Sequence, residues 1–461
     1  MNVKKLVCSI ISLSLLVNCG IAALPVSASA VDTDTEIYVS PDGNDSNSGS
    51  SESPFKTLER AKAEVRVHNS NMSGNIIVNI ASGVYYMDNT LEFTQADSGT
   101  NGFSVIYRGI TDENGNSPIV SGGVDISDNW ELYDESLNIY KHENIDWSFR
   151  QLYTNNDRAI RARVPNLENK ETGGPYFRAS GGDGSYPLFI GTNNEYAQKA
   201  GNDAEIIWNS SWSQFRARIE SYNSSTGRVT FKAPDNSFAW NHHTQGDTPF
   251  YLENSLAYLD SEGEWYLDKD TSTLYYKPRE GEIMNKTEII APKLETIIDI
   301  NGTDENKTEN ITFDGIQFLH SNWLATDSYG YCSVQGGFRY QSEGGKDNSA
   351  IRGSARYDAP KSMVQLRHTK NISLINSEFS FSGSWGIMGY EDTENTFIDH
   401  NVFTKNAGGG VTMGMAGREW DDQTENEQPR TYTDMDGQSR YDTITNNYID
   451  HVACEYQDMV G

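Results

Sequence analysis

The sequence predicts an all-β protein whose main part is a right-handed parallel β-helix, a solenoid of short stacked strands. The first observation behind this prediction is a 24-residue repeat in the C-terminal third of the chain. The second is a composition that favours strands and turns, with 40 glycines and 25 tyrosines among 461 residues. The third is an amphipathic helix near the N-terminus, which would cover one open end of the solenoid.

The repeat is an apolar pair with five-residue spacing. The step from Leu374 to Ile398 is 24 residues, and the neighbouring steps of 61 and 46 residues fit one coil plus an insertion. Asn and Gly stand at the turns, where left-handed backbone is needed. The absence of an L-x-x-L-x-L pattern argues against leucine-rich repeats. We expect Leu374 to lie directly beside Ile398 in the stack. The pairs are Phe313/Phe318, Leu374/Phe379, Ile398/Phe403 and Ile444/Ile449.

The N-terminal part of the mature chain fits the same architecture. Strands are expected at residues 36–40, 76–80, 84–86, 90–93 and 103–107. Ser53 and Pro54 have the residue types of an N-cap and first helical position, so a helix is predicted to open there. The predicted apolar face of that helix consists of Phe55, Leu58, Ala61 and Val65.

The first thirty residues have the pattern of a secretory signal. Lys4 and Lys5 precede an apolar run over residues 6–24, and Ala28 and Ala30 supply an A-x-A cleavage site. A membrane anchor is the alternative, but polar and glycine residues interrupt the run, and no later run could span a bilayer. The mature protein is therefore expected to begin at Val31 and to be secreted to the extracellular space.

Charge and cysteine content restrict the partners. With 36 Lys+Arg against 65 Asp+Glu, the formal net charge is −29, which excludes a basic face for nucleic acid or for an anionic membrane. Cys332 and Cys454 remain after signal removal, and whether they pair is undecided. HExxH and CxxC spacings are absent, so no metal site is predicted. No cofactor is expected, with calcium left open, and the oligomeric state is also open.

Residues 149–285 lack the 24-residue period and contain Trp208, Trp212, Trp240 and Trp265. They are predicted to be a β-rich domain that folds separately. It is inserted between an N-terminal cap with the first coils, residues 31–148, and the main solenoid, residues 286–461. A strand is expected to begin at Asp458, which favours a solenoid that continues beyond Gly461.

Three stretches of the chain resemble family 141 of the glycoside hydrolases. The first is IYVSPDGND at residues 37–45 with PFKTL at 54–58, and the second is RQLY at 150–153 with RAIRARVP at 158–165. The third contains YLEN at 251–254, GEWYLD at 263–268 and LYY at 274–276. The second and third are similar to the insertion domain of that family. The resemblance implies a secreted glycosidase of xylanase or fucosidase type, acting on plant-type polysaccharides or fucosylated glycans.

Glycoside hydrolysis needs two carboxyl groups, so acidic residues on long loops of the solenoid are the candidates. The loops at residues 319–361 and 415–441 are predicted to wall a groove. The second loop places Asp421 and Asp422 beside Trp420, whose ring could stack on a sugar.

A second acidic group, Glu455 and Asp458, precedes the strand expected at Met459. The register stacks Trp385, Gly409 and Asp458 on successive coils, with open space expected over the glycine. A ring, a gap and a carboxylate in line would suit a bound sugar. Asp458 is therefore the strongest catalytic candidate, and Trp385 is a second substrate-binding candidate.

Two alternatives to a hydrolase remain. A polysaccharide lyase on the same fold would use calcium and a basic residue on an anionic substrate, which the net charge disfavours unless calcium bridges the two. A non-catalytic carbohydrate-binding protein or adhesin would bind sugar without cleaving it.

Overall fold

The computed structural model describes residues 34–461 except 171, 180–187, 211–212, 233–246, 335–337, 342–355, 359, 415–437, 458 and 460–461. Strands are the main regular secondary structure of these residues and helices are few, which confirms the all-β part of the predicted fold class. The α-helices are α1 (Leu58–His68), α2 (Glu195–Lys199) and α3 (Ala325–Tyr329). No helix in this described part is long and apolar enough to cross a membrane.

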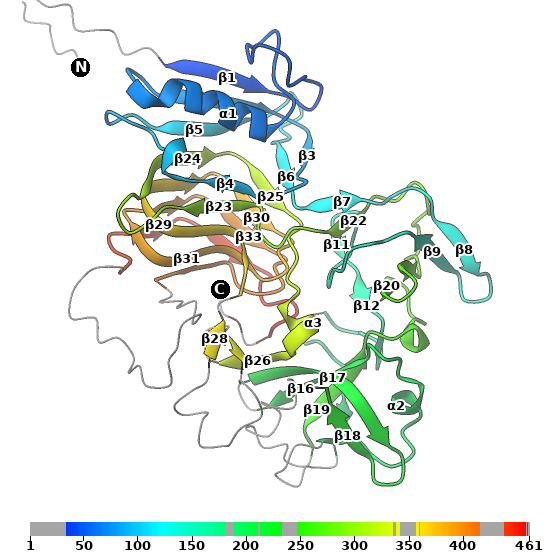
Figure 1. Ribbon diagram of the computed structural model, residues 1–461. Helices are drawn as coiled ribbons and strands as arrows, with labels where there is room; N and C mark the ends of the chain where they lie inside the picture. Colours follow the sequence, from blue (N-terminus) through cyan, green and yellow to red (C-terminus); the bar gives the residue numbers. More distant parts are fainter. Residues whose placement is uncertain are drawn as a thin grey trace, which may run out of the picture.

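Parallel strands stack in three ladders, and each coil of the chain contributes in turn to the first, second and third ladder (Figure 1). The first ladder contains β4 (Leu91–Phe93), β23 (Ile298–Asn301), β29 (Ser362–Ile375), β31 (Trp385–Glu394) and β34 (Val411–Met413). The second contains β1 (Thr35–Val39), β2 (Ile76–Ala81), β5 (Val105–Ile110), β24 (Thr308–Asp314), the second half of β29, β32 (Phe397–Asp399) and β35 (Thr443–Thr445). The third contains β3 (Val84–Tyr86), β6 (Ile119–Ser121), β25 (Gln317–Leu319), β30 (Glu378–Ser380), β33 (Val402–Thr404) and β36 (Tyr448–Asp450).

The predicted register is confirmed. Leu374 pairs with Phe313 on one side and with Ile398 on the other, and Ile398 pairs with Ile444. Phe379 occupies the matching place in the third ladder, where its ring stacks on those of the coils before and after it at centroid distances of 5.2 Å. The buried apolar side chains inside the stack form one continuous core.

Asparagines hold the corners between strands. Asn310, Asn371 and Asn395 all have positive φ, and two side-chain amides link them across coils: Asn371 donates to Asn310 at 2.8 Å and Asn395 donates to Asn371 at 2.6 Å. Asparagine tolerates left-handed backbone because its short amide can hydrogen-bond locally. The same residue type therefore supplies both the turn and the contact between coils.

The helix α1 lies beside β1 at one end of the stack (Figure 1). Its cap is Thr57, so it begins at Leu58, and the predicted opening at Ser53 and Pro54 is wrong. The reason is that Phe55 pairs with the backbone of Tyr38, while the Asp45 carboxylate accepts the N–H groups of residues 56 and 57, which keeps this segment extended.

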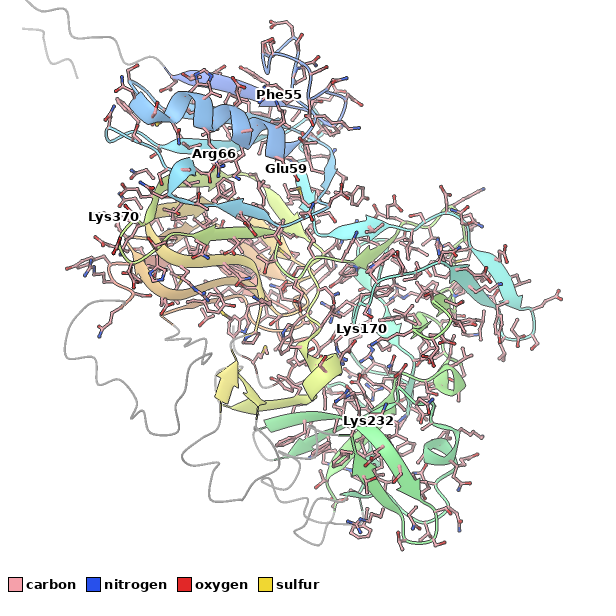
Figure 2. The ribbon with its side chains drawn as sticks, in the orientation of Figure 1. Phe55, Glu59, Arg66, Lys170, Lys232 and Lys370 are labelled. Atoms are coloured by element: carbon pink, nitrogen blue, oxygen red, sulfur yellow. The ribbon has the colours of Figure 1, made fainter. Side chains whose placement is uncertain are left out.

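The expected apolar face of α1 is nevertheless buried, from Phe55 before the helix to Val65 in its last turns. Near the helix end, Arg66 forms two hydrogen bonds of 2.7 and 2.8 Å with the buried carboxylate of Asp97, which fixes the helix on the stack. Figure 2 labels Phe55 and Arg66 beside the helix.

The remaining strands form three antiparallel or mixed sheets beside the stack (Figure 1). A four-stranded sheet contains β7 (Gly123–Asp125), β22 (Ile289–Pro292), β10 (Tyr153–Thr154) and β11 (Asp157–Arg158). A five-stranded sheet contains β12 (Ile160–Arg161), β20 (Glu264–Asp268), β21 (Thr273–Tyr276), β9 (Ile139–Glu143) and β8 (Glu131–Asp134). A ten-stranded sheet contains β13 (Arg163–Val164), β14 (Phe177–Arg178), β15 (Leu188–Phe189), β16 (Glu205–Ser210), β17 (Ser213–Asn223), β18 (Arg228–Phe231), β19 (Pro249–Glu253), β26 (Tyr331–Val334), β27 (Phe338–Gln341) and β28 (Arg356–Asp358).

The sheets that contain strands of residues 149–285 also take strands from outside these bounds, and the separate folding of this part stays a prediction. The strands β8 and β9 precede residue 149, yet β9 pairs with β21. The strands β26 to β28 follow residue 285 and extend the ten-stranded sheet from β17. The pairing of β26 with β17 covers a strand edge that would otherwise have unpaired backbone groups. Such long-range pairing cannot be read from the periodicity of the sequence.

Candidate functional site

Glu455 lies where the described end of the stack meets the ten-stranded sheet. One carboxylate oxygen is 2.6 Å from Nη1 of Arg158, and the other accepts a 3.0 Å hydrogen bond from Nε2 of Gln151. The side chain keeps 17% of its surface exposed. A carboxylate is thus held in a fixed orientation while part of it faces solvent.

Arg158 reaches this position from a tight hairpin. The strands β10 and β11 are joined by Asn155 and Asn156, both with positive φ, as a two-residue hairpin turn requires. The Arg158 guanidinium donates to the carbonyl oxygens of two corners of the third ladder, at Ser382 and Lys405. These anchors position Nη1 toward Glu455.

The surroundings of Glu455 favour its charged form. Burial raises the pKa of its carboxyl group, but the guanidinium groups of Arg158 and Arg216 and the hydrogen bond from Gln151 outweigh burial, so the pKa lies below its ordinary value. Glu455 is therefore ionised at neutral pH, which suits a nucleophile or general base rather than a proton donor.

A buried ionic network joins Glu455 to the ten-stranded sheet. Arg216 donates to the backbone oxygen of Glu455 at 2.7 Å and to the Glu253 carboxylate at 2.7 Å. Arg161 then bridges Glu253 at 2.8 Å and Glu205 at 3.1 Å. Each carboxylate in this chain of contacts is neutralised by guanidinium groups.

The network ends at Arg150, which is fully buried. Its two Nη atoms are each 2.8 Å from the Glu205 carboxylate, and Nη1 also contacts Asp327 from α3. Burial opposes ionisation of Glu205, but Arg150 and Arg161 hold its pKa well below its ordinary range. The Glu205 and Glu253 side chains are only 4% and 6% exposed, which suits a structural role, whereas Glu455 and Asp327, at 17% and 14%, keep some contact with solvent.

Trp385 is not the open sugar platform that the sequence predicted. Its side chain is 1% exposed and packs with Trp323 and Tyr456 in a separate apolar cluster. A Cβ placed on Gly409 would fall 2.1 Å from the Trp385 ring, so the ring fills the space that was expected to be empty. The glycine permits close packing of the ring and does not leave a gap.

The prediction that the loop at residues 319–361 walls a groove stays a prediction. The described part of this loop forms α3 and the strands β26 to β28, which belong to the ten-stranded sheet. Trp420, Asp421, Asp422 and Asp458 lie outside the described residues, as does most of the loop at 415–441. Glu455 is thus the one predicted catalytic residue that the described part of the structure places.

Sequence reasoning missed the partners of Glu455. Gln151 and Arg158 belong to stretches that resemble family 141, but the resemblance assigns them no role, and the sequence does not single out Arg216. A signal did exist: basic residues recur at alternate positions 161 and 163, and 216 and 218, in otherwise strand-like segments. Cys454 is a free cysteine, so the undecided pairing with Cys332 is not formed.

Comparisons with known proteins concern the inserted part of the chain and its fold. Residues 137–279 match the model of the GH141 insertion domain, which confirms the resemblance to family 141 through that domain. A solved structure described as "Glycoside hydrolase" aligns with a TM-score of 0.80 at 24% identity, over 92% of this chain and 74% of the other. The complex structure of XylC with xylose aligns with a TM-score of 0.44 at 11% identity, over 92% of this chain and 56% of the other. No curated protein matches in sequence.

Proposed function

We propose that this chain is a glycoside hydrolase that acts on a plant-type polysaccharide or a fucosylated glycan, of xylanase or fucosidase type. The observation that carries the proposal is the GH141 insertion domain at residues 137–279. The fold shared with a solved glycoside hydrolase supports the scaffold. The position of Glu455 beside that domain supports the chemistry.

The proposal includes the architecture. The three parallel ladders support a right-handed parallel β-helix. Its parts are a cap with the first coils at residues 31–148, an insertion at 149–285 and the main solenoid at 286–461. The antiparallel sheets take strands from all three parts, so these bounds divide the chain by sequence pattern.

Glu455 is the charged member of the proposed catalytic pair. Its carboxylate attacks the anomeric carbon, or removes a proton from the water that does so, while a protonated acid gives its proton to the leaving oxygen. Asp458, Asp421 and Asp422 are the proposed acids, and Trp420 is the proposed stacking ring. Arg158 and Gln151 orient Glu455 and keep it ionised before this step, in which the carboxylate forms a bond to the anomeric carbon or takes up the proton of the water.

Export is the second part of the proposal, with cleavage after Ala30. It rests on the basic residues, apolar run and A-x-A site within residues 1–30, which lie outside the described residues. N-terminal sequencing of protein from the medium should begin at Val31. Mature protein that still carries Lys4 and Lys5 would contradict it.

Digestion of a glycan panel with the full chain tests the activity. A hydrolase releases saturated sugars with new reducing ends, and we expect this on a neutral plant-type or fucosylated glycan. Products with an unsaturated ring and ultraviolet absorbance would identify a lyase instead. Binding to a glycan without any product, across the whole panel, would favour the adhesin alternative and overturn the proposal.

A further inference from the structure

A second cluster of ionisable side chains lies at the corner between the first and second ladders, away from Glu455. His368 and Asp392 occupy equivalent places in consecutive coils, because the residues on either side of them pair: Arg367 with Glu391, and Thr369 with Thr393. Lys370, labelled in Figure 2, lies at the edge of the stack beside this corner. The stacked positions therefore bring an imidazole and a carboxylate together.

Asp304 joins them from the coil before. The strands β23 and β24 pair with β29 through Asn301 with Arg367 and through Thr308 with Thr369. Residues 302–307 thus form a six-residue turn at the position that the single residue His368 occupies in the next coil. This turn carries Asp304 to the corner, where Oδ1 is 3.1 Å from Nδ1 of His368.

The three side chains converge on one point. Nδ1 of His368 is also 3.2 Å from Oδ2 of Asp392, and one ligand atom from each of the three residues lies within 4.8 Å of the others. Ligands bound tetrahedrally to zinc at about 2.0–2.1 Å lie about 3.3 Å apart, close to both contacts. Small side-chain adjustments would therefore make room for an ion.

The electrostatics also favour a cation. Nδ1 carries at most one hydrogen, so it cannot serve both carboxylates equally well. Lys307 lies 2.7 Å from Oδ1 of Asp392, the oxygen that faces away from this contact, and it is shared with Glu394 at 3.4 Å. Oδ2 of Asp392 is left for a further positive charge, and Lys307 fixes the orientation of the carboxylate.

We propose that Asp304, His368 and Asp392 form a binding site for a divalent transition-metal ion, with zinc as the expected occupant. An imidazole with two carboxylates suits zinc better than calcium, which prefers oxygen ligands alone. The ion joins three consecutive coils at one corner and leaves a fourth position for water. The sequence does not predict this site, because 64 and 24 residues separate the ligands, far from any local spacing.

The chain supplies its own control. His400 also has positive φ and contacts Asp399 at 2.5 Å, but only this one carboxylate is paired with it. His400→Ala removes an exposed histidine that is paired with the aspartate before it in the sequence. It therefore tests whether any such pair would bind the ion.

Isothermal titration of the tag-free full chain with zinc chloride at pH 7.5, after EDTA treatment and dialysis, tests the site. We expect wild type and His400→Ala to bind one more equivalent than His368→Ala, or to bind it at least about tenfold more tightly. Asp304→Asn should weaken binding in the same direction. The Asp304 side chain is 84% exposed, so this change leaves the fold intact. Zinc should also raise the thermal midpoint of wild type and not of His368→Ala.

Two results would overturn the proposal. One is a wild type that takes up no zinc at micromolar concentrations. The other is equal zinc binding by wild type, Asp304→Asn and His368→Ala. Zinc binding is measured directly, so these outcomes are independent of whether the chain cleaves a glycan.

Discussion

Replacement of Arg150 by methionine tests whether the buried ionic network holds the ten-stranded sheet on the stack. Methionine keeps the apolar stem and removes the guanidinium. Glu205 then retains only Arg161, at 3.1 and 3.4 Å, and Asp327 retains only Lys269 at 2.6 Å. Both carboxylates stay largely shielded from solvent, with side chains 4% and 14% exposed.

The expected cost is large because a buried charge is left undercompensated. Removing one partner of a buried ion pair costs about 3–5 kcal/mol in the free energy of unfolding. Because Arg161 and Lys269 still pair with the two carboxylates, we expect Arg150→Met to lower the free energy of unfolding by about 3 kcal/mol, the lower end of this range. Lys199→Met is the matched control, since Lys199 and Glu195 are 60% and 66% exposed, and it should cost below about 1 kcal/mol.

Urea-induced unfolding followed by tryptophan fluorescence measures both variants. Buried Trp208 in the ten-stranded sheet and buried Trp265 in the five-stranded sheet contribute to the signal. We expect a lower midpoint for Arg150→Met and an almost unchanged one for Lys199→Met. A loss for Arg150→Met no greater than that of the control would refute the reasoning, because the network would then contribute nothing to holding the parts together.

Three further predictions concern the stack. Phe379→Ala should cost about 3–5 kcal/mol in chemical denaturation, since the ring is fully buried between two others, and a loss below 1 kcal/mol would argue against the aromatic stack. Asn371→Ala should cost about 2 kcal/mol, from two ladder hydrogen bonds and a left-handed backbone. Asn371→Gly should recover only the backbone part, and equal stability of the two variants would contradict this. The hydrogen bond from Arg440 is the main cause that lowers the pKa of Glu394 to about 2. The stability that ionised Glu394 contributes is therefore present above about pH 4.5 and is lost as pH falls toward 2. Thermal midpoints of Glu394→Gln should therefore fall less than those of wild type across that range, and parallel curves would count against the ion pair.

The register of the stack could be predicted because it depends on the spacing of apolar residues along the sequence. A 24-residue period places Leu374 beside Ile398, and the structure pairs them. Turn asparagines such as Asn371 were predictable for the same reason, since left-handed backbone restricts the residue type. Repetition supplies several independent observations of one geometry.

The site could not be predicted to the same depth because its contacts join distant segments. Glu455 was named as an acid, yet its partners Gln151 and Arg158 lie about 300 residues earlier. The prediction that Trp385 is exposed to solvent is wrong, because strand register gives the position of a residue but not which side chains cover it. The predicted start of the first helix is wrong for a similar reason. The backbone N–H groups of residues 56 and 57 donate to the distant Asp45 carboxylate, and these hydrogen bonds compete with helix formation.

The most direct test of the proposed function is the turnover of Glu455→Gln on whichever glycan the wild type cleaves. Glu394→Gln is the matched control, because its side chain is 18% exposed, close to the 17% of Glu455, and is also paired with an arginine. We predict that kcat of Glu455→Gln falls by about two orders of magnitude or more while Glu394→Gln keeps wild-type turnover. A folded Glu455→Gln with kcat within a factor of a few of wild type would contradict the account, because the ionised carboxylate would then take no part in bond cleavage.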